Sequence, residues 1–490
     1  MNYLKKKKSF KISQISQKEF CKFSLCPKDY KELLLVNSNT IKLSEEIKNW
    51  YKGIEIGSDN YIKKSPFRFL KTVNVTSSFI LGDTSVEHCK PFSGNQPKNN
   101  DILIVKDGLG SGLGEVALYK NNTKYKDYIS SGIIGIEIKD KKKYYILGIL
   151  KSQHFKDFIN INTAQGSTIR HSKLIAFNYL VPFPTTLSHA NVNLIEQYIS
   201  VFTQNVINKE EQIKAKCKLI DRFFENELFS SKKKANNYTY PKKSTLVSCN
   251  RLDTIIYSEK YYEYDTAIKS YKNGYFLLKK GNVSPGRTPD DYYFSSTKKS
   301  SIFYEWVTPK NINGRKLDYK TYIHTKSNTN VCKNNIILNG IRYVGNGIYI
   351  DNEDMVFSNQ NTLVIKNFTE ASNQLFLYTF LTSKIGKYMQ MAQRNLGIVP
   401  ILYADNLCKI PIPKITDMIK SKIIKEYYNP VKVNSKLTIK NYLEKEKKRN
   451  KTAGIHQLNS EVFVLKEKLD YIINKIIKEE RIENKYLKFK

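Results

Sequence analysis

Two stretches of the sequence share one pattern, and together they decide the fold: KSQHFKDFININTAQGSTIRHSKLIAFNYLVPFP (residues 151–184) and TSKIGKYMQMAQRNLGIVPILYADNLCKIPIP (residues 382–413). Each passes from a helix end through a polar stretch and a glycine among small apolar residues. A short apolar segment and a terminal Pro-x-Pro follow. Two diverged copies of one module explain this recurrence most economically, because a repeated supersecondary unit leaves such self-similarity in the sequence.

Each pattern closes a region of short β-like runs. The first region contains FRFLKTVNV, DILIVKDG and SGIIGIEI before the helix-like KYYILGILKS; the second contains NNIILNGI, GIYID and NTLVIKNF before the helix-like NQLFLYTFLTSKIGKYMQ. Short apolar runs bounded by Gly, Asn and Lys are typical of strands. The sequence therefore predicts two β-rich regions.

A long helix is predicted between these regions, from Ser188 to Phe229, where the sequence contains no Gly or Pro. Apolar residues recur there at steps of three and four: Val192, Ile195, Ile199, Phe202, Val206, Ile213, Ile220 and Phe223. Lys209 and Lys216 interrupt this stripe. A helix of about 42 residues is far longer than the mean of about 11–12, which favours a coiled-coil-like spacer over a core helix.

The C-terminal stretch is helix-forming again. One apolar stripe contains Val462, Leu465, Leu469, Ile472 and Ile476. Pro430 and the segment EKEKKRNKTAG (residues 444–454) interrupt the helical pattern. We therefore expect an α+β protein with two β-rich domains separated by long coiled-coil-like helices. The predicted order is an unassigned N-terminal arm (1–50), a first β-rich domain (51–187), a helical spacer (188–232), a second β-rich domain (233–415) and a C-terminal helical region (416–490).

The charge of the chain points to a polyanionic partner. The 490 residues include 81 Lys and Arg against 45 Asp and Glu, a formal net charge of +36. The coding habit of an AT-rich genome would explain the Lys, Ile, Asn and Tyr excess, but not the shortage of acids. With 40% hydrophobic residues the chain is folded and not a basic tail, so we expect nucleic acid binding.

The cysteines and the N-terminus indicate a cytoplasmic protein. The cysteines are scattered and form no CxxC pair: Cys21, Cys26, Cys89, Cys217, Cys249, Cys332 and Cys408. We expect reduced packing thiols. The opening MNYLKKKKSFKIS has the positive start of a signal peptide without its apolar stretch, and no run reaches about 18 apolar residues, so neither secretion nor membrane spanning is expected.

The glycines after DILIV do not form a nucleotide-binding loop. Gly108, Gly110, Gly112 and Gly114 stand at every second position, which matches neither GxGxxG nor GxxxxGKS. A tight hairpin that lets the backbone approach a strand or a DNA phosphate is the better interpretation.

A Mg²⁺-dependent nuclease is the alternative function from a different class. Asp127, Glu137 and Lys139 have the order of a D…ExK metal site, where two carboxylates hold Mg²⁺ against a scissile phosphate. The same residues also fit an ordinary alternating strand, IIGIEIK, and such triplets arise by chance in a Lys-rich chain. We therefore assign the chain neither a catalytic nor a metal site.

A methyltransferase active site is not expected either. Adenine methyltransferases hold the flipped base with a (D/N)PP(Y/F) segment, and the nearest approach here, Asn429-Pro430-Val431, lacks the aromatic residue. The histidines have no Ser or Cys partner motif and are expected in the core or on the surface: His88, His154, His171, His189, His324 and His456.

Basic residues at turns are the better functional candidates. Arg can contact guanine bidentately, whereas Lys mostly contacts phosphate. The predicted DNA-binding residues are Lys106, Arg170, His171, Lys173, Lys279, Lys280, Arg287, Lys310, Arg315, Arg342 and Arg394.

Five phrases in this order resemble the specificity subunit of type I restriction-modification systems: DILIVKDGLGSGLGEVALYK (101–120), QGSTIRHSKLIAFNYLVPFP (165–184), KKGNVSPGRTPDDYYF (279–294), YEWVTPKNING (304–314) and LGIVPILYADNLCKIPIP (396–413). With the long helices, the resemblance covers roughly residues 51–480. It implies that the β-rich domains are target recognition domains, each reading one half of a bipartite DNA site, and that the helices dock methyltransferase subunits.

The resemblance implies a non-catalytic subunit that directs a separate adenine-N6 methyltransferase to its DNA target. S-adenosylmethionine would then bind the partner, with no cofactor in this chain. The expected partners are double-stranded DNA, two methyltransferase subunits and a motor nuclease restriction subunit. A recognition subunit of another multi-subunit modification or phage-defence system stays open as a neighbouring alternative.

Overall fold

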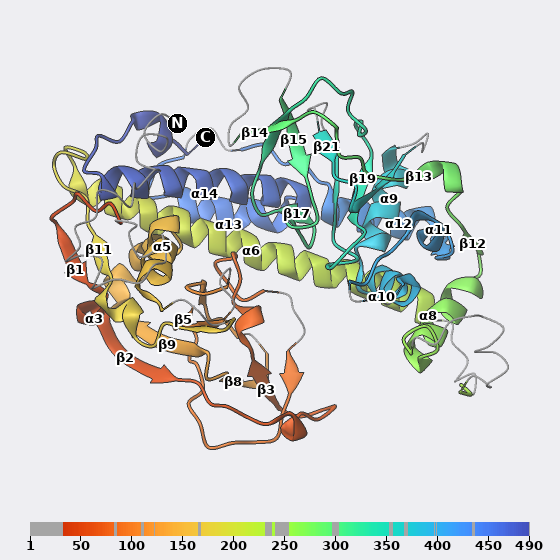
Figure 1. The fold of residues 1–490 in the computed structure, drawn as a ribbon, viewed down its shortest axis with the longest axis horizontal. Coiled ribbons are helices and arrows are strands. Elements are labelled where there is room, and N and C mark those ends of the chain that lie inside the picture. Colours follow the sequence, from red (N-terminus) through yellow and green to blue (C-terminus); the bar gives the residue numbers. More distant parts are fainter. Residues whose placement is uncertain are drawn as a thin grey trace, which may run out of the picture. The chain divides into compact units, whose positions relative to one another are not determined.

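The structure is a computed structural model, and it describes residues 33–82, 86–108, 112–121, 123–164, 168–230, 238–240, 254–295, 303–351, 356–366, 371–395, 397, 399–433 and 437–489. Its contacts divide the chain into two compact units. Unit 1 consists of Met1–Glu211, Lys432–Lys451 and Ser460–Lys490, and unit 2 of Gln212–Val431 and Thr452–Asn459. Strands and helices occur in both (Figure 1).

The long predicted helix is present as α6 (Val192–Phe229), four residues shorter at its start than the sequence pattern suggested. Asn191 sets the start, because its side-chain oxygen accepts a hydrogen bond from the backbone N–H of Leu194 at 3.0 Å, as an N-cap residue does. Ser188 belongs to the preceding turn, with its N–H bonded to the carbonyl of Thr185. The unit boundary falls within α6, after Glu211.

The apolar stripe of α6 is buried largely as predicted. Ile195, Ile199, Phe202, Val206 and Ile220 have no exposed surface. At the C-terminal end the stripe turns by one residue, since Phe224 and not Phe223 is fully buried.

Unit 1 contains two main sheets and two short strand pairs. The four-stranded antiparallel sheet has the order β2-β9-β5-β7, with β2 Ile47–Lys52, β9 Ile133–Ile138, β5 Ile102–Val105 and β7 Val116–Leu118. The three-stranded sheet has the order β4-β3-β8, with β4 Glu87–His88, β3 Phe67–Leu70 and β8 Lys126–Ile129. The pairs are β1 (Thr40–Lys42) with β11 (Leu180–Pro182) and β6 (Asp107–Gly108) with β10 (Arg170–His171).

Residues just before position 51 are part of this β-rich fold and are not a separate arm. Strand β1 pairs with β11, and β2, which starts at Ile47, pairs with the central strand β9. The sequence pattern did not indicate these two strands, because each pairs with a strand about 90 to 140 residues away and local periodicity does not report such pairing. Residues 1–32 lie outside the described residues.

Unit 2 repeats this architecture. One four-stranded sheet has the order β13-β22-β19-β20, with β13 Val283–Pro285, β22 Thr362–Ile365, β19 Ile336–Asn339 and β20 Gly347–Tyr349. The other has the order β14-β18-β15-β21, with β14 Tyr293–Ser295, β18 Tyr322–His324, β15 Phe303–Val307 and β21 Val356–Ser358. The pairs are β12 (Tyr275–Phe276) with β23 (Ile412–Pro413) and β16 (Ile312–Asn313) with β17 (Lys316–Leu317).

The strand pairings confirm the internal duplication. The arrangement of β2, β9, β5 and β7 corresponds to that of β13, β22, β19 and β20, and each unit has one parallel pair, β3 with β8 and β15 with β21. Each closing Pro-x-Pro overlaps a strand that pairs with the first strand of its module, β11 with β1 and β23 with β12. The repeated phrases also start alike, since Ser152 and Ser383 cap α5 (Gln153–Asn162) and α10 (Lys384–Gln393).

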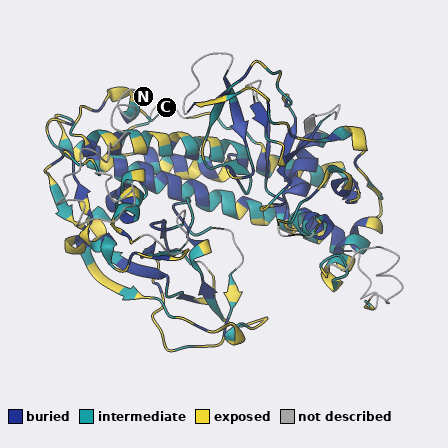
Figure 2. Ribbon diagram, viewed as in Figure 1, coloured by how far each residue is buried: buried dark blue, intermediate teal, exposed yellow. Residues whose placement is uncertain are grey.

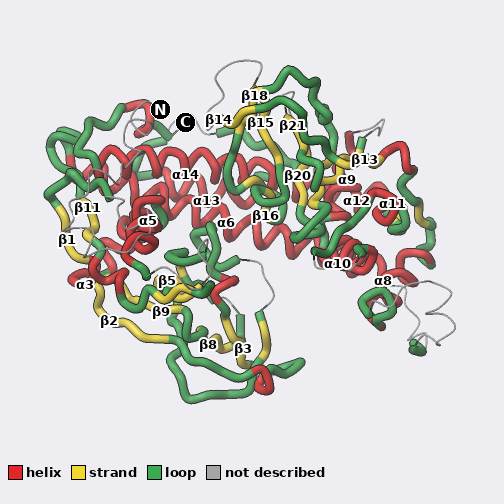
Figure 3. The backbone as a smooth tube through the Cα atoms, in the orientation of Figure 1, coloured by secondary structure: helices red, strands yellow, loops and turns green. Residues whose placement is uncertain are grey.

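The other α-helices are α3 Leu43–Glu46, α4 Lys143–Leu150, α8 Glu259–Lys269, α9 Ala371–Leu381, α11 Ala404–Leu407, α12 Asp417–Tyr427, α13 Tyr442–Thr452 and α14 Ile455–Ile477. Short 3-10 turns occur at Ser58–Asn60, Thr72–Asn74, Asp140–Lys142, Ile175–Asn178, Lys280–Asn282 and Asn484–Leu487. Within the described residues, no helix is long and apolar enough to cross a membrane. Figure 3 shows where helix, strand and loop fall along the chain.

The predicted C-terminal stripe is confirmed, because Val462, Leu465, Leu469, Ile472 and Ile476 are all buried on α14. The predicted interruptions are also present: Pro430 lies between α12 and α13, and the Lys-rich segment, most of which forms α13, ends in the break at Gly454 before α14. There a side chain would place a Cβ atom 2.4 Å from the backbone nitrogen of Asn429. Only glycine fits so close a backbone approach.

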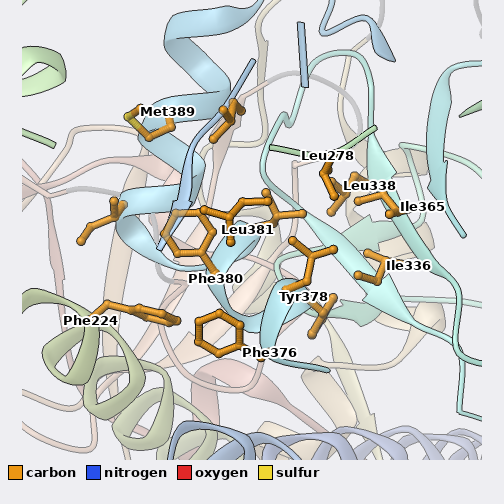
Figure 4. Packing of buried hydrophobic residues seen from close by; sticks show 14 of the residues in the cluster. Phe224, Leu278, Ile336, Leu338, Ile365, Phe376, Tyr378, Phe380, Leu381 and Met389 are labelled. Atoms are coloured by element: carbon orange, nitrogen blue, oxygen red, sulfur yellow. The ribbon is translucent and has the colours of Figure 1, made fainter. Parts of the chain in front are cut away.

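Buried residues lie along the helices and the inner strands (Figure 2), and most of them are apolar. In unit 2 they form one large cluster between α6, α9 and the β13-β22-β19-β20 sheet (Figure 4). Phe224 of α6 packs edge-on against Phe380 of α9, with ring centroids 5.5 Å apart. This packing holds the sheet of unit 2 on the helix that the sequence predicted as a spacer.

Candidate nucleic-acid interface

In unit 1, two loops are joined where the central strand β5 ends. The carbonyl of Lys106, the first residue after β5, accepts hydrogen bonds from the backbone N–H and the side-chain hydroxyl of Ser172, at 2.8 and 2.9 Å. Next to this contact, Arg170 and His171 pair with Gly108 and Asp107 in strands β10 and β6. We call residues 106–115 and 164–173 loop pair 1; residues 109–111 and 165–167 lie outside the described residues.

Unit 2 has the same junction at the same place. The carbonyl of Gly340, the first residue after β19, accepts a hydrogen bond from the N–H of Leu402 at 2.7 Å. Ile341 and Ile401 form an antiparallel bridge beside it. Residues 340–346 and 394–403, of which 396 and 398 lie outside the described residues, are loop pair 2. The duplication therefore extends to the loops and does not stop at the sheets.

Four predicted DNA-binding residues lie on loop pair 1: Lys106, Arg170, His171 and Lys173. The ammonium group of Lys106 forms an ion pair with Asp107, and the Nδ1 atom of His171 lies 3.1 Å from the other carboxylate oxygen of Asp107. The His171 side chain is 62% exposed, and Lys173 is exposed on a backbone with a φ of +48°. Asp107 thus holds two basic groups side by side at the edge of the loop pair.

Arg342 and Arg394 lie on loop pair 2. Arg342 is exposed, and its φ of +58° places it at a tight turn, like Lys173 in unit 1. Arg394 is half-buried at the C-terminal end of α10. Lys280 comes close to the end of this loop pair through its ion pair with Asp405 at 3.1 Å.

Arg170 is a structural residue, which corrects its prediction as a reader of DNA. It is buried, and its guanidinium group donates to the Asn160 side chain at 2.9 Å and to the carbonyls of Asn160 and Thr163 at 2.7 and 2.8 Å. These acceptors end helix α5, where unpaired carbonyls attract a cation. Its hydrogen-bonding fork is therefore occupied within the protein.

Arg315 is likewise held inside unit 2. Its guanidinium group donates to the hydroxyl of Thr382 at 2.8 Å and to the sulfur of Cys217 at 3.1 Å. A base could reach this group only after these contacts were broken. The remaining predicted residues, Lys279, Arg287 and Lys310, are exposed on other loops of unit 2.

The nuclease triplet is not assembled. Asp127 is buried, and Arg68 binds it with two hydrogen bonds of 2.7 and 2.8 Å while the hydroxyl of Tyr119 donates a third at 2.8 Å. Glu137 and Lys139 belong to the other sheet or its end, with the Lys139 ammonium bonded to the carbonyl of Glu45. Among the described residues, no group of three or more His, Cys, Asp or Glu side chains could hold a metal ion.

The glycine cluster forms the predicted hairpin between the antiparallel strands β5 and β7. Gly114 closes it with a φ of +77° and an N–H bonded to the carbonyl of Val105 at 3.0 Å. Gly110 lies outside the described residues. The described cysteines, Cys89, Cys217, Cys332 and Cys408, form no disulfide, and the other three lie outside the described residues.

Sequence reasoning missed the apolar side chains on both loop pairs. Ile169 is 54% exposed on loop pair 1, and Tyr343, Val399 and Tyr403 are 61%, 45% and 50% exposed on loop pair 2. Exposed apolar side chains beside cations are suited to contacts with base edges and thymine methyl groups. Ile169 and Tyr343 stand next to an arginine in the sequence, whereas Val399 and Tyr403 do not. Only their exposure in the fold singles out all four.

Comparisons with known proteins find similar architectures only among solved structures. No family model and no curated protein matches the chain. A type I restriction-modification S subunit from M. genitalium aligns over 91% of this chain and 98% of its own, with 16% identity and a TM-score of 0.34. The HsdS subunit from Thermoanaerobacter tengcongensis aligns over 90% and 96%, with 10% identity and a TM-score of 0.26.

A third structure, a chain of a type I R-M system complex, aligns over 92% of this chain and 99% of its own, with 10% identity and a TM-score of 0.28. These identities and TM-scores are too low to assign a function, whereas the duplicated loop pairs are a feature of the chain itself.

Proposed function

We propose that this chain is a sequence-specific DNA-binding subunit that reads a bipartite target, one half-site with each loop pair. The observation that carries the proposal is the duplication of the loop junction. In both units, the residue after the central strand accepts the hydrogen bond that joins the two loops. Two equivalent interfaces in one chain are suited to two short sites on one duplex.

The chemistry of the loop pairs supports DNA as the ligand. Each pair presents exposed basic groups, His171 and Lys173 on one and Arg342 on the other, together with exposed apolar side chains. Contacts to phosphate fix the position of a protein on the duplex, whereas Arg and apolar side chains distinguish bases. The net charge of +36 supplies the long-range attraction to the polyanion.

The reaction at the target is assigned to a partner. We propose that a separate adenine-N6 methyltransferase subunit binds S-adenosylmethionine and the flipped base, and that a motor nuclease restriction subunit joins the complex. The resemblance of the five sequence phrases supports this assignment. In the chain itself, Asp127, the first member of the nuclease-like triplet, is neutralised by Arg68.

The test is a selection of DNA by the purified chain from a pool of random-sequence duplexes, followed by sequencing. We expect two conserved half-sites separated by a gap of unread bases. Substituting Arg342→Ala should cost about 1–3 kcal/mol at one position of one half-site. Substituting His171→Ala and Lys173→Ala together should affect the other half-site only.

Lys422→Ala provides the matched control, because Lys422 is exposed on α12 of unit 2 and lies outside loop pair 2. It should leave both half-sites unchanged. A continuous motif, or a loss in the same half-site from both loop pairs, would refute the proposal.

A further inference from the structure

A group of exposed lysines surrounds the three-stranded sheet β4-β3-β8 of unit 1. Lys126 starts β8 and pairs with Phe67 of β3, and its N–H bonds to the carbonyl of Pro66 at 2.8 Å. The turn before β3, which contains Lys63 and Lys64, is tied to β4 because Ile62 donates to the carbonyl of His88 at 3.0 Å. Strands β3 and β8 lie side by side (Figure 3).

Two further lysines complete this group. Lys90 follows β4, and its N–H bonds to the carbonyl of Asn60 at 3.1 Å, close to the turn with Lys63 and Lys64. Lys124 precedes β8 by two residues. We call Lys63, Lys64, Lys90, Lys124 and Lys126 the basic face.

The cations of the basic face are available to a ligand. All five lysines are exposed, and none forms an ion pair with a carboxylate among the described residues. The nearby acids are few: Glu87 is 3.7 Å from Lys71, Asp59 is exposed, and Asp127 is bound to Arg68. Positive charge therefore predominates on this sheet.

Aromatic rings lie close to two cations of this sheet. The Arg68 guanidinium lies 4.8 Å from the centre of the Tyr125 ring, and the Lys126 ammonium lies 5.9 Å from that of Phe67. Because Asp127 takes both ends of the Arg68 fork, this arginine is not available to read a base. What remains exposed are lysine ammonium groups, which act as point charges and suit phosphate.

The corresponding sheet of unit 2 is different in its described part. Its edge strand β14 exposes Tyr293 and Phe294, by 55% and 59%, directly after the exposed acids Asp290 and Asp291. Among the described residues, the edge of this sheet in unit 2 thus presents aromatic and acidic side chains, whereas the sheet of unit 1 presents lysines.

We propose that the basic face is a second DNA contact, separate from loop pair 1, that binds the phosphate backbone of duplex DNA without regard to sequence. This inference rests on the proposed function, since it adds an anchoring surface to the reading loops. It predicts that unit 1 contributes more to the salt dependence of binding than its reading loop alone would.

The experiment replaces Lys63, Lys64, Lys90 and Lys126 together with Gln and measures duplex affinity over a series of salt concentrations. Two duplexes of equal length are used, one with the selected target and one without it. The slope of log K against log salt should become shallower by about 0.9 for each phosphate that the variant no longer neutralises. Affinity should fall by the same factor for both duplexes.

The matched control replaces Lys422, Lys425, Lys447 and Lys451, which are exposed lysines on helices, with Gln. It changes the net charge equally and should leave the slope nearly unchanged. An equal change in both quadruple variants, or no change in the first, overturns the inference. The single variants Lys64→Gln and Lys126→Gln give the same readout, with about 0.9 each, if the quadruple variant does not fold.

Failure of this inference can be told apart from failure of the proposed function. If the selected duplex carries a bipartite motif but the slope does not change, only the basic face is refuted. If no sequence preference exists but the slope changes, the basic face stands and the reading loops are refuted.

Discussion

Removing the charge of Lys209 should destabilise unit 1 strongly, although the sequence presents it only as an interruption of an apolar stripe. Lys209 is 1% exposed, and its ammonium group contacts Glu446 at 2.8 Å, Glu461 at 2.5 Å and Asn450 at 2.8 Å. Arg449 binds the same two carboxylates through further hydrogen bonds of 2.5 to 2.8 Å. Two cations and two carboxylates thus form a neutral cluster.

The change Lys209→Met removes the ammonium group but keeps an unbranched apolar side chain, and it leaves two carboxylates facing one guanidinium group. Breaking a buried ion pair on one side typically costs about 3–5 kcal/mol, because a charge stays buried without compensation. We expect a loss near the lower end, about 3 kcal/mol, since Glu446 keeps its hydrogen bonds with Arg449. The double variant Lys209→Met, Glu461→Gln restores neutrality and should recover part of the loss.

The pKa of Glu446 determines how the stability difference between the wild type and Lys209→Met depends on pH. Burial raises this pKa, but hydrogen bonds and charge from Arg449 and Lys209 outweigh it and lower the pKa from 4.5 to about 2. A carboxyl group with a lowered pKa stabilises the fold above its unfolded pKa, and this contribution disappears as the pH falls towards the folded pKa. The difference between wild type and Lys209→Met should therefore be largest above about pH 4.5 and shrink between pH 4.5 and 2.

The assay is urea unfolding followed by tryptophan fluorescence. The chain has two tryptophans, Trp50 in unit 1 and Trp306 in unit 2, so a Trp306→Phe background reports on unit 1 alone. Lys448→Met is the control, because Lys448 is 77% exposed and pairs with Glu444 four residues earlier on the same helix. Solvent screens such surface pairs, so they contribute little to stability. Equal losses from Lys209→Met and Lys448→Met would refute the reasoning.

Two further predictions separate structural from DNA-reading roles. Arg170→Ala should lower the free energy of unfolding of unit 1 by about 3 kcal/mol, because the buried carbonyls of Asn160 and Thr163 lose a charged donor. Urea unfolding measures this loss. A variant that keeps its stability but no longer recognises one base of the selected motif would contradict the prediction. Asp127→Asn should also destabilise unit 1 by about 3 kcal/mol, because it leaves Arg68 half-paired. A supercoiled plasmid incubated with Mg²⁺ should stay intact with the wild type as with this variant, and cleavage by the wild type alone would restore the nuclease alternative.

The internal repeat and the long helix were predictable because they depend on local periodicity. The spacing of Ile195, Ile199, Phe202 and Val206 follows from the geometry of a helix with one buried face. The β runs before each Pro-x-Pro likewise became strands. The start of α6 was misplaced by four residues because the N-cap at Asn191, a single side-chain hydrogen bond, decided it.

The candidate site was predictable only in part. Lys173 and Arg342 lie on exposed turns, as turn residues do, and these turns were recognised from glycine and polar residues. Arg170 and Arg315 stand in equally polar phrases, yet both are held by partners inside the protein. Composition cannot distinguish an exposed arginine from one that satisfies the carbonyls at the end of a helix.

Periodicity, composition and motif spacing were enough to predict the duplicated modules, the spacer helix and the positive charge. They also disfavoured a catalytic role for Asp127, Glu137 and Lys139. Tertiary structure alone decided which charges meet. The Lys209 cluster joins residues more than 230 positions apart, and the basic face gathers lysines from three separate segments. Charge interactions depend on the distance between the groups and on their burial, and neighbouring residues in the sequence indicate neither of these.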